Sequence, residues 1–176
     1  GDGIEADVGE EDDGRAGHGA DGGAAAVHHA RHPMTEEADA GDIVSQKKLP
    51  IGYEDNAASL YKKILETAKI QIRELSLGLL HNSIKFIPQD QAQSNNWRKR
   101  TARDGLIDWR MSSLSIYNLI RALSPPYKGA HCAINGTEYK IWLAQELPDN
   151  LTHIEAGKVL ASNSDGSFLV KCGQGI

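Results

Sequence analysis

The sequence predicts an α/β chain in which a strand and a long helix are followed by a small open barrel of short strands. Three observations support this prediction. An apolar strand pattern over residues 42–51 precedes a helical apolar repeat that runs to about residue 80. A second, shorter helical repeat follows near residue 112, and beyond residue 130 the apolar pattern takes the two-residue period of strands.

Residues 1–33 differ in composition from the rest of the chain. They contain eight glycines and seven alanines, and their only large aliphatic side chains are Ile4, Val8 and Val27. Such a segment cannot bury enough apolar surface to offset the entropy of ordering it, so we expect disorder. It holds eight acidic residues against two arginines, whereas residues 34–176 are nearly neutral, with sixteen acidic and seventeen basic groups. Nothing in this balance demands a nucleic-acid or anionic-membrane partner.

Histidines cluster near the end of this first segment. His28, His29 and His32 have a spacing at which a helix can hold a metal ion. A solvated His-rich tail is the alternative, and it is the interpretation we favour. We therefore predict no metal site.

A strand is expected over residues 42–51. Ile43, Leu49 and Ile51 are its apolar positions, and Gly52 follows its end. Asp55 or Asn56 caps the helix that comes next and runs to about residue 80. One face of this helix carries an apolar stripe formed by Leu60, Ile64, Ala68, Ile72, Leu75 and Leu79.

A second part of the chain begins after a short strand predicted at 84–87 and a polar linker over 89–105. Ser112 or Ser113 caps a helix whose Leu114, Tyr117, Leu119, Ile120 and Leu123 face a core, and Ser124-Pro125-Pro126 stops it. Strands at 130–134 and 138–144 flank Asn135-Gly136, a strong hairpin signal because both residues tolerate positive φ. A second hairpin is predicted from strands at 158–161 and 167–172.

Cysteine usage and hydropathy place the chain in a broad class. Cys132 and Cys172 are the only cysteines, and no secretory apolar segment or membrane-length apolar run is present. These features predict a cytoplasmic protein with reduced thiols and no membrane partner.

Two sequence blocks resemble the C-terminal half of the formyltransferases that use 10-formyltetrahydrofolate. The first, Glu37-Ala38-Asp39-Ala40-Gly41-Asp42-Ile43, is similar to the Asp-x-Gly-Asp loop of that family. The second runs from Arg98 to Trp142 and includes KRTARDGLIDW, NLIRALSPPYKGAH and YKIW. The resemblance covers residues 34–176. It implies a remnant of a Rossmann-like catalytic domain at 34–88, the linker, and a truncated OB-like β-barrel domain at 106–176.

The resemblance also implies a reaction and its site. A primary amine attacks the formyl carbon carried on N10 of the folate, an Asn and a His stabilise the oxyanion, and an Asp accepts or organises the amine proton. Asp39 matches that catalytic Asp, and Glu37, Ala38 and Asp39 match the loop that lines the pterin pocket. Apart from the resemblance, an acid in a turn before a strand often only caps a backbone amide.

The expected Asn-x-His step is not found upstream of Asp39. No asparagine precedes that residue, and His28, His29 and His32 are not assigned the catalytic role. We therefore expect an incomplete copy of the family that is weakly active or inactive. Residues 1–33 then read as unrelated sequence joined at Met34.

Two acceptor classes remain open. The step Pro126-Tyr127-Lys128-Gly129-Ala130 and the late Cys172-Gly173-Gln174-Gly175 resemble sugar-nucleotide formyltransferases, which favours an amino-sugar nucleotide. The IDW element and the hairpin are shared with methionyl-tRNA formyltransferases, and the basic cluster Arg98–Arg103 with Trp97 could contact tRNA. A non-catalytic OB-like binding fragment is the third alternative, and a homodimer is a further candidate assembly.

The remaining conspicuous residues are predicted to be structural. Trp109 and Trp142 sit beside apolar neighbours and are expected in the core. His131 is expected to pack on a strand, and Cys172 lacks a nearby base that would mark a nucleophile.

Overall fold

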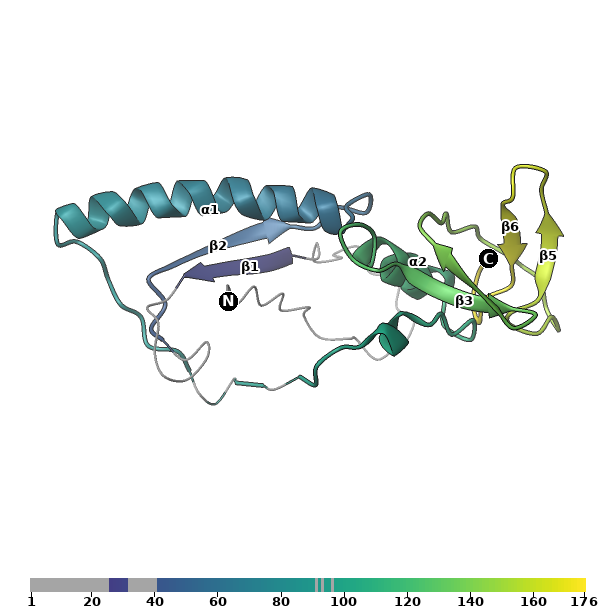
Figure 1. The fold of residues 1–176 in the computed structure, drawn as a ribbon. Helices are drawn as coiled ribbons and strands as arrows, with labels where there is room; N and C mark the ends of the chain where they lie inside the picture. The colour runs from purple at the N-terminus through teal and green to yellow at the C-terminus, as the bar shows by residue number, and fades with distance from the viewer. Residues whose placement is uncertain (1–25, 32–40, 91, 93, 96) are drawn as a thin grey trace. The chain divides into compact units, whose positions relative to one another are not determined.

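The structure, a computed structural model, describes residues 26–31, 41–90, 92, 94, 95 and 97–176. The chain folds into two compact units. Unit 1 contains the described residues up to Asp55 together with Ser59–Trp97, and unit 2 contains Asn56–Ala58 with Arg98–Ile176. Both combine helix with small antiparallel sheets (Figure 1).

Unit 1 consists of a two-stranded antiparallel sheet and one long helix. β1 (Ala26–Arg31) pairs with β2 (Ser45–Pro50), with Ala26 opposite Pro50 and Arg31 opposite Ser45. The helix α1 (Ala57–Leu80) runs along this sheet (Figure 1). Burial alternates along β2, as expected for a strand with one face against a helix and the other in solvent. The α/β layer predicted for this region is therefore present, and its two described strands, β1 and β2, pair in antiparallel directions.

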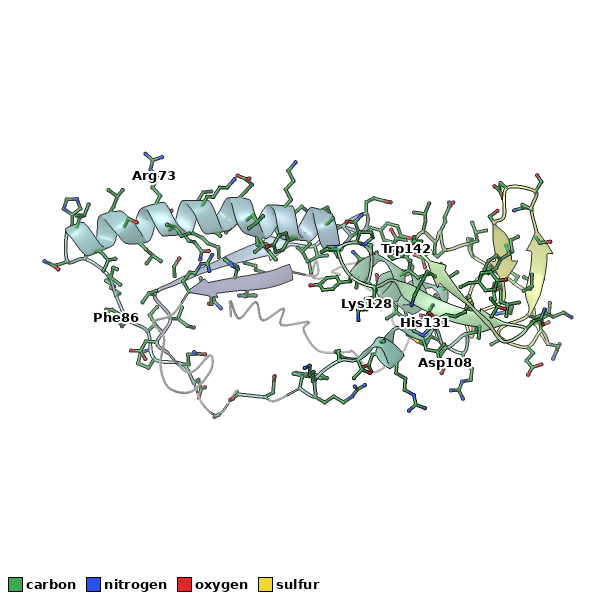
Figure 2. All side chains as sticks on the ribbon, in the orientation of Figure 1. Arg73, Phe86, Asp108, Lys128, His131 and Trp142 are labelled. Carbon is green, nitrogen blue, oxygen red and sulfur yellow. The ribbon has the colours of Figure 1, made fainter. Side chains whose placement is uncertain are left out.

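The predicted helix is confirmed, but part of its predicted buried stripe is wrong. Ile64 and Ala68 are buried as expected, whereas Ile72 is 57% and Leu79 67% exposed. A spacing of four residues drifts around a helix that has 3.6 residues per turn. The buried line therefore passes from Ala68 to Gln71. Figure 2 shows Arg73 on the opposite side of α1, pointing away from the sheet.

Two further sequence predictions need correction in unit 1. Ala26–Arg31 form β1, so the disorder predicted for residues 1–33 is wrong for this stretch. Its alanines and histidines are ordered by six cross-strand pairs with β2 and by α1, which sequence composition does not reveal. The strand predicted at 84–87 is reduced to one antiparallel bridge between Ile87 and Ile43.

Unit 2 begins with a short helical turn and a second helix. The 3-10 helix η2 (Ala102–Gly105) lies within the predicted linker, and Thr101 and Asp104 form a capping box at its start. α2 (Ser113–Ala122) follows, with Ser112 at its N-cap accepting a hydrogen bond from the backbone N–H of Ser115 at 3.1 Å. The serine predicted to cap this helix is thereby confirmed.

Two hairpins complete unit 2. β3 (Ala130–Ile134) and β4 (Thr137–Ile141) are joined by Asn135-Gly136, whose φ values of 51° and 80° confirm the predicted tight turn. β5 (Val159–Ser162) pairs with β6 (Phe168–Val170) in a second antiparallel hairpin. The described strands form three separate two-stranded sheets, one in unit 1 and two in unit 2, and they do not close into a barrel.

The core of unit 2 lies between α2 and the strands. Its buried members are Ile107, Ile116, Ile120, Ala130 and Cys172. Trp109 packs against this core as predicted. Two expected core residues differ from the prediction, because Leu114 is 46% and Trp142 47% exposed. Ile116, one helical turn before Ile120, takes the buried position on α2 instead.

A buried ion pair holds the loop before β5 to the end of β6. The Lys171 Nζ lies 3.2 Å from Asp149 Oδ2, and both side chains are less than a tenth exposed. The same ammonium donates to the backbone carbonyl of Cys172 at 2.7 Å. Because removing one partner of a buried pair leaves an uncompensated charge, the two residues must act as a unit.

A second polar cluster fixes the start of α1. Asp55 accepts hydrogen bonds from the Gly52 backbone N–H at 2.6 Å and from the Ser59 hydroxyl at 2.8 Å, and it pairs with the Lys63 ammonium. The hydrogen bond from Lys63, followed by those from Gly52 and Ser59, lowers the pKa of Asp55 from 3.8 to about 2 against an opposing effect of burial.

The lowered pKa of Asp55 predicts a pH dependence of folding. A carboxyl whose pKa is lower in the folded state stabilises the fold above its unfolded pKa of 3.8, and this is lost as the pH falls toward 2. With Lys63 partly solvated, we expect a loss of about 1–2 kcal/mol over that interval. Urea titrations of wild type and Asp55→Asn at pH 6, 4 and 2.5 measure this. The variant should lose that component, and an unchanged pH dependence in the variant contradicts the assignment.

Candidate functional site

The residues predicted to form the site lie in the connection between β1 and β2. Glu37, Ala38 and Asp39 are outside the described residues, so their contacts are not part of the structure. The described residues on either side form the frame of this connection. It departs from Arg31 at the end of β1 and returns at Gly41.

Backbone hydrogen bonds fix both ends of the connection. The Val44 N–H donates to the Arg31 carbonyl at 2.8 Å, which closes the hairpin just beyond its last strand pair. Ile43 exchanges two hydrogen bonds with Ile87, at 2.8 and 3.0 Å. The side-chain amide of Gln89 donates to the Gly41 carbonyl at 2.7 Å. The sequence following α1 therefore holds the segment that leads directly away from Asp39.

A buried polar cluster under the hairpin supplies a third support. Gln71 on α1 is fully buried, and its side chain bonds to residues of both strands. Its amide nitrogen donates to the His29 carbonyl at 3.1 Å and to the Ser45 hydroxyl at 2.9 Å, and its oxygen lies 2.7 Å from His29 Nδ1. Gln71 was not predicted as a functional residue from the sequence. The signal that could have found it is a polar residue between Ala68 and Leu75 at the helical period of the buried face.

His29 is therefore a structural residue of the hairpin. It is 7% exposed and bonded to Gln71, where a solvated tail was predicted. His28, on the other face of β1, is exposed. Within the described part of the chain no group of three or more His, Cys, Asp or Glu side chains could hold a metal ion.

An aromatic groove of about 370 Å³ lies in unit 2. It lies between α2 and the two hairpins, and its aromatic lining residues are Trp109, Tyr117, Tyr139, Trp142 and Phe168. Lys140, Gln145 and Glu146 supply polar groups at its wall. Tyr139 and Trp142 are about half exposed, so flat rings are available to a planar or apolar group.

The predicted basic cluster is partly neutralised by its neighbours. Arg98 pairs with Asp104, and this guanidinium holds the pKa of that carboxyl well below its usual range. Arg110 binds Asp108 through two nitrogens, at 2.8 and 2.6 Å, which lowers the Asp108 pKa to about 2. Among the described residues no ion pair joins Lys99, Arg100 or Arg103, the cations of this segment that remain for an anionic partner.

The two steps that resemble sugar-nucleotide formyltransferases have packing roles. Gly129, with φ of 81°, lies under the Trp142 ring, where an added Cβ would be 2.8 Å from the ring edge. Gly173 lies against the segment before α2. Its N–H donates to the carbonyls of Trp109 and Met111, both at 2.9 Å, and an added Cβ would be 1.9 Å from the Arg110 carbonyl oxygen. Only glycine can occupy this close approach of two backbones.

Neither cysteine has the surroundings of a nucleophile. Cys132 and Cys172 are both buried, and burial raises the pKa of each thiol. The prediction that Cys172 is structural agrees with this environment. His131 is also buried in β3, as predicted, with its backbone carbonyl accepting from the Ile107 N–H at 2.8 Å.

Comparison with known proteins identifies the class to which unit 2 belongs. Residues 99–176 match the family model described as formyl transferase, C-terminal domain. The C-terminal region of this chain is therefore a formyltransferase-family domain, and the family resemblance predicted for this region is confirmed.

Solved structures share the fold over most of the chain. HypX from Aquifex aeolicus in complex with tetrahydrofolic acid matches 86% of this chain with a TM-score of 0.61 and 21% identity. The N-formyltransferase from Helicobacter canadensis, in complex with folinic acid and dTDP-3-aminofucose, matches 86% with a TM-score of 0.54 and 19% identity. A 4-N formyltransferase from Francisella tularensis matches 68%, with a TM-score of 0.57 and 22% identity.

The chain spans only part of these proteins. It covers 26% of the HypX chain, 56% of the Helicobacter canadensis enzyme and 50% of the Francisella tularensis enzyme. In the described part of this chain, no helix has both the length and the apolar character of a membrane span.

The backbone contact at Gly173 predicts a large effect of a single methyl group. Gly173→Ala should destabilise the protein by about 3 kcal/mol or more, because Cβ would overlap the backbone carbonyl oxygen of Arg110 in the segment before α2. The matched control is Gly136→Ala in the β3–β4 turn, where no atom lies within 4 Å and only the positive φ costs about 1–2 kcal/mol. Chemical denaturation of both variants gives the comparison, and equal losses contradict the proposed packing.

Proposed function

We propose that the chain is part of an enzyme that transfers a formyl group from 10-formyltetrahydrofolate to the primary amine of an amino-sugar nucleotide. The observation that carries the proposal is the formyltransferase C-terminal domain at residues 99–176, downstream of a hairpin connection that contains Asp39. Under this proposal residues 34–88 belong to a Rossmann-like catalytic domain, and unit 2 is an OB-like domain.

The proposed chemistry assigns one catalytic group to this chain. The folate supplies an activated formyl group on N10. As the acceptor nitrogen bonds to the formyl carbon it must lose a proton, and Asp39 is the group that accepts it. The bond from the formyl carbon to N10 breaks, and N10 takes up a proton, so the proton count balances. Glu37 and Ala38 contribute backbone to the wall of the pterin pocket.

This chain lacks two of the groups that the formyl transfer reaction needs. Stabilisation of negative charge on the formyl oxygen needs donors, which the family resemblance attributes to an Asn and a His. The sequence before Asp39 contains no asparagine, and the described His29 is occupied with Gln71. We therefore expect weak activity or none from the 176 residues alone.

An amino-sugar nucleotide is favoured as acceptor on two grounds. The Pro126–Ala130 step resembles sugar-nucleotide formyltransferases, and the Helicobacter canadensis relative was crystallised with dTDP-3-aminofucose. The Cys172–Gly175 step carries less weight, since Gly173 serves backbone packing that any acceptor class would need. Methionyl-tRNA remains the competing acceptor.

A second function is favoured by the groove of unit 2. Aromatic rings beside cations are the usual means of holding single-stranded nucleic acid on OB-like domains. Tyr139 and Trp142 supply half-exposed rings, and Lys140 supplies a cation in the wall of the same groove. In this alternative the fragment binds RNA without catalysis.

Calorimetric titration separates the two functions. The first titration uses a stable 10-formyltetrahydrofolate analogue, and the proposal expects saturable binding that Asp39→Ala weakens at least tenfold. Gln46→Ala, an exposed position on β2, is the control and should bind as wild type does. The second uses single-stranded RNA at 50 and 200 mM salt. Salt-sensitive RNA binding with no folate binding favours the alternative and rejects the formyl transfer proposal for this chain.

A further inference from the structure

The strand β4 in unit 2 is exposed on both of its faces. Thr137, Glu138, Tyr139 and Lys140 are all exposed, whereas the first three residues of its partner β3 are buried. β4 pairs with β3 on one side, and among the described strands none pairs with it on the other. An edge of this kind presents unpaired backbone N–H and C=O groups and can accept a further strand.

The register of the hairpin identifies the groups on this outer edge. The two-residue turn Asn135-Gly136 makes Ile134 and Thr137 a hydrogen-bonded pair. Such pairs alternate with non-hydrogen-bonded pairs along an antiparallel ladder. The backbone N–H and C=O groups of Glu138 and Lys140 therefore point away from β3. In the described part of the chain, neither residue has a backbone hydrogen bond to another segment.

The side chains beside these groups carry opposite charges. Lys140 Nζ lies 3.0 Å from Glu138 Oε1, and the two side chains are 35% and 59% exposed. An ion pair this exposed contributes little within one chain, because water screens it and both side chains lose entropy. Between the two charges lies Tyr139, which is 48% exposed. The outer edge of β4 thus presents an acid, an aromatic ring and a base in sequence.

This order of side chains is complementary to a second, antiparallel copy of β4 in one register. The outward groups of Glu138 and Lys140 must meet outward groups of the added strand, so the pairing is centred on Glu138, Tyr139 or Lys140. Centring on Glu138 or on Lys140 puts that residue opposite its own copy, and like charges directly opposite are destabilising. Centring on Tyr139 puts each Glu138 opposite a Lys140. The charges therefore select this register.

We propose that the outer edge of β4 is an interface at which two copies of this chain associate. The two hairpins then form one continuous antiparallel sheet around a twofold axis, and each opposed Glu138 and Lys140 exchange backbone hydrogen bonds. Tyr139 of each copy faces Tyr139 of the other. Because Tyr139 also lines the aromatic groove, the second copy adds a ring at the rim of that groove.

This interface gives a surface to the homodimer that the sequence left as a candidate assembly. It does not depend on the proposed function, since no residue of the formyl transfer site takes part. The contact is a short strand pair with few exposed apolar side chains, so the association is weak.

Sedimentation of the full chain tests the interface. Wild type should change from monomer to dimer as its concentration rises from about 10 μM to about 1 mM. Glu138→Lys and Lys140→Glu each put like charges opposite one another in the dimer and should weaken association at least tenfold. The matched control is Lys128→Glu, the same change of charge at an exposed position in the loop before β3, and it should associate as wild type does.

Combining the two charge reversals supplies the decisive comparison. The double variant with Glu138→Lys and Lys140→Glu again has opposite charges across the interface, so it should recover most of the wild-type affinity. An equimolar mixture of the two single variants should also dimerise, although each alone associates weakly. Both kinds of rescue require the two positions to face each other across the interface, which a role in folding alone does not predict.

Amide hydrogen exchange reports the backbone part of the contact. The N–H groups of Glu138 and Lys140 should exchange more slowly at high protein concentration than at low concentration. Wild type that remains monomeric at about 1 mM overturns the proposal. A dimer that survives both single charge reversals, or that leaves these two amides unprotected, uses another surface and also overturns it.

Circular dichroism separates loss of fold from loss of association. If a charge-reversed variant fails to fold, Glu138→Gln and Lys140→Gln supply the same comparison. These variants remove a charge without reversing it, so they should weaken the dimer by less than the reversals do. Unchanged association in both of the folded glutamine variants contradicts the proposed pairing of Glu138 with Lys140.

Discussion

Hydrogen bonding of a single buried amide is the interaction on which the geometry of unit 1 depends. The described residues of this unit bury few apolar side chains, chiefly Ile64 and Ala68 on α1. Such a small apolar contact cannot by itself select one pairing of two polar strands. Gln71 makes the selection because it is satisfied at one register only. The described residues on either side of the connection that contains Asp39 are then held by Gln71 at His29 and Ser45, by Ile87 at Ile43 and by Gln89 at Gly41.

Unit 2 reaches a defined geometry by a different route. Its core of aliphatic side chains joins α2 to the strands, and close backbone packing at Gly173 joins the chain's last residues to the start of that helix. The Ser113 N–H donates to the Gln174 carbonyl at 2.8 Å, which extends the same contact. The buried pair of Lys171 and Asp149 ties a third segment to this point. The family motifs in this region therefore have a physical role in packing, which is separate from any role in acceptor choice.

Local signals in the sequence predicted most elements. The 3.6-residue repeat located α1, Ser112 located the start of α2, and Asn135-Gly136 located the β3–β4 hairpin, because each depends on neighbours along the chain. β1 was not predicted, because it is formed by pairing with β2, whose residues lie fourteen or more positions further along the chain. The sequence pattern predicted that Ile72 is buried on α1, but the buried residue is its neighbour Gln71. The partners that allow this polar side chain to be buried, His29 and Ser45, are distant in sequence.

The candidate site was predictable only through the family resemblance. Composition and spacing alone left Asp39 as an acid in a turn, and its contacts lie outside the described residues. The contacts that hold the residues on either side of it come from the three-dimensional structure, because Gln89 and Gln71 bind Gly41 and His29 from positions that follow them by more than forty residues.

A double-mutant cycle between Gln71 and Ser45 tests the central claim most directly. Gln71→Leu, Ser45→Ala and the double variant are compared with wild type by urea denaturation. If the amide and hydroxyl are coupled as described, the losses will fail to add by about 1 kcal/mol or more. Additive losses, within about 0.3 kcal/mol, would mean that the hydrogen bond at 2.9 Å does not hold the hairpin, and the account of unit 1 would be wrong.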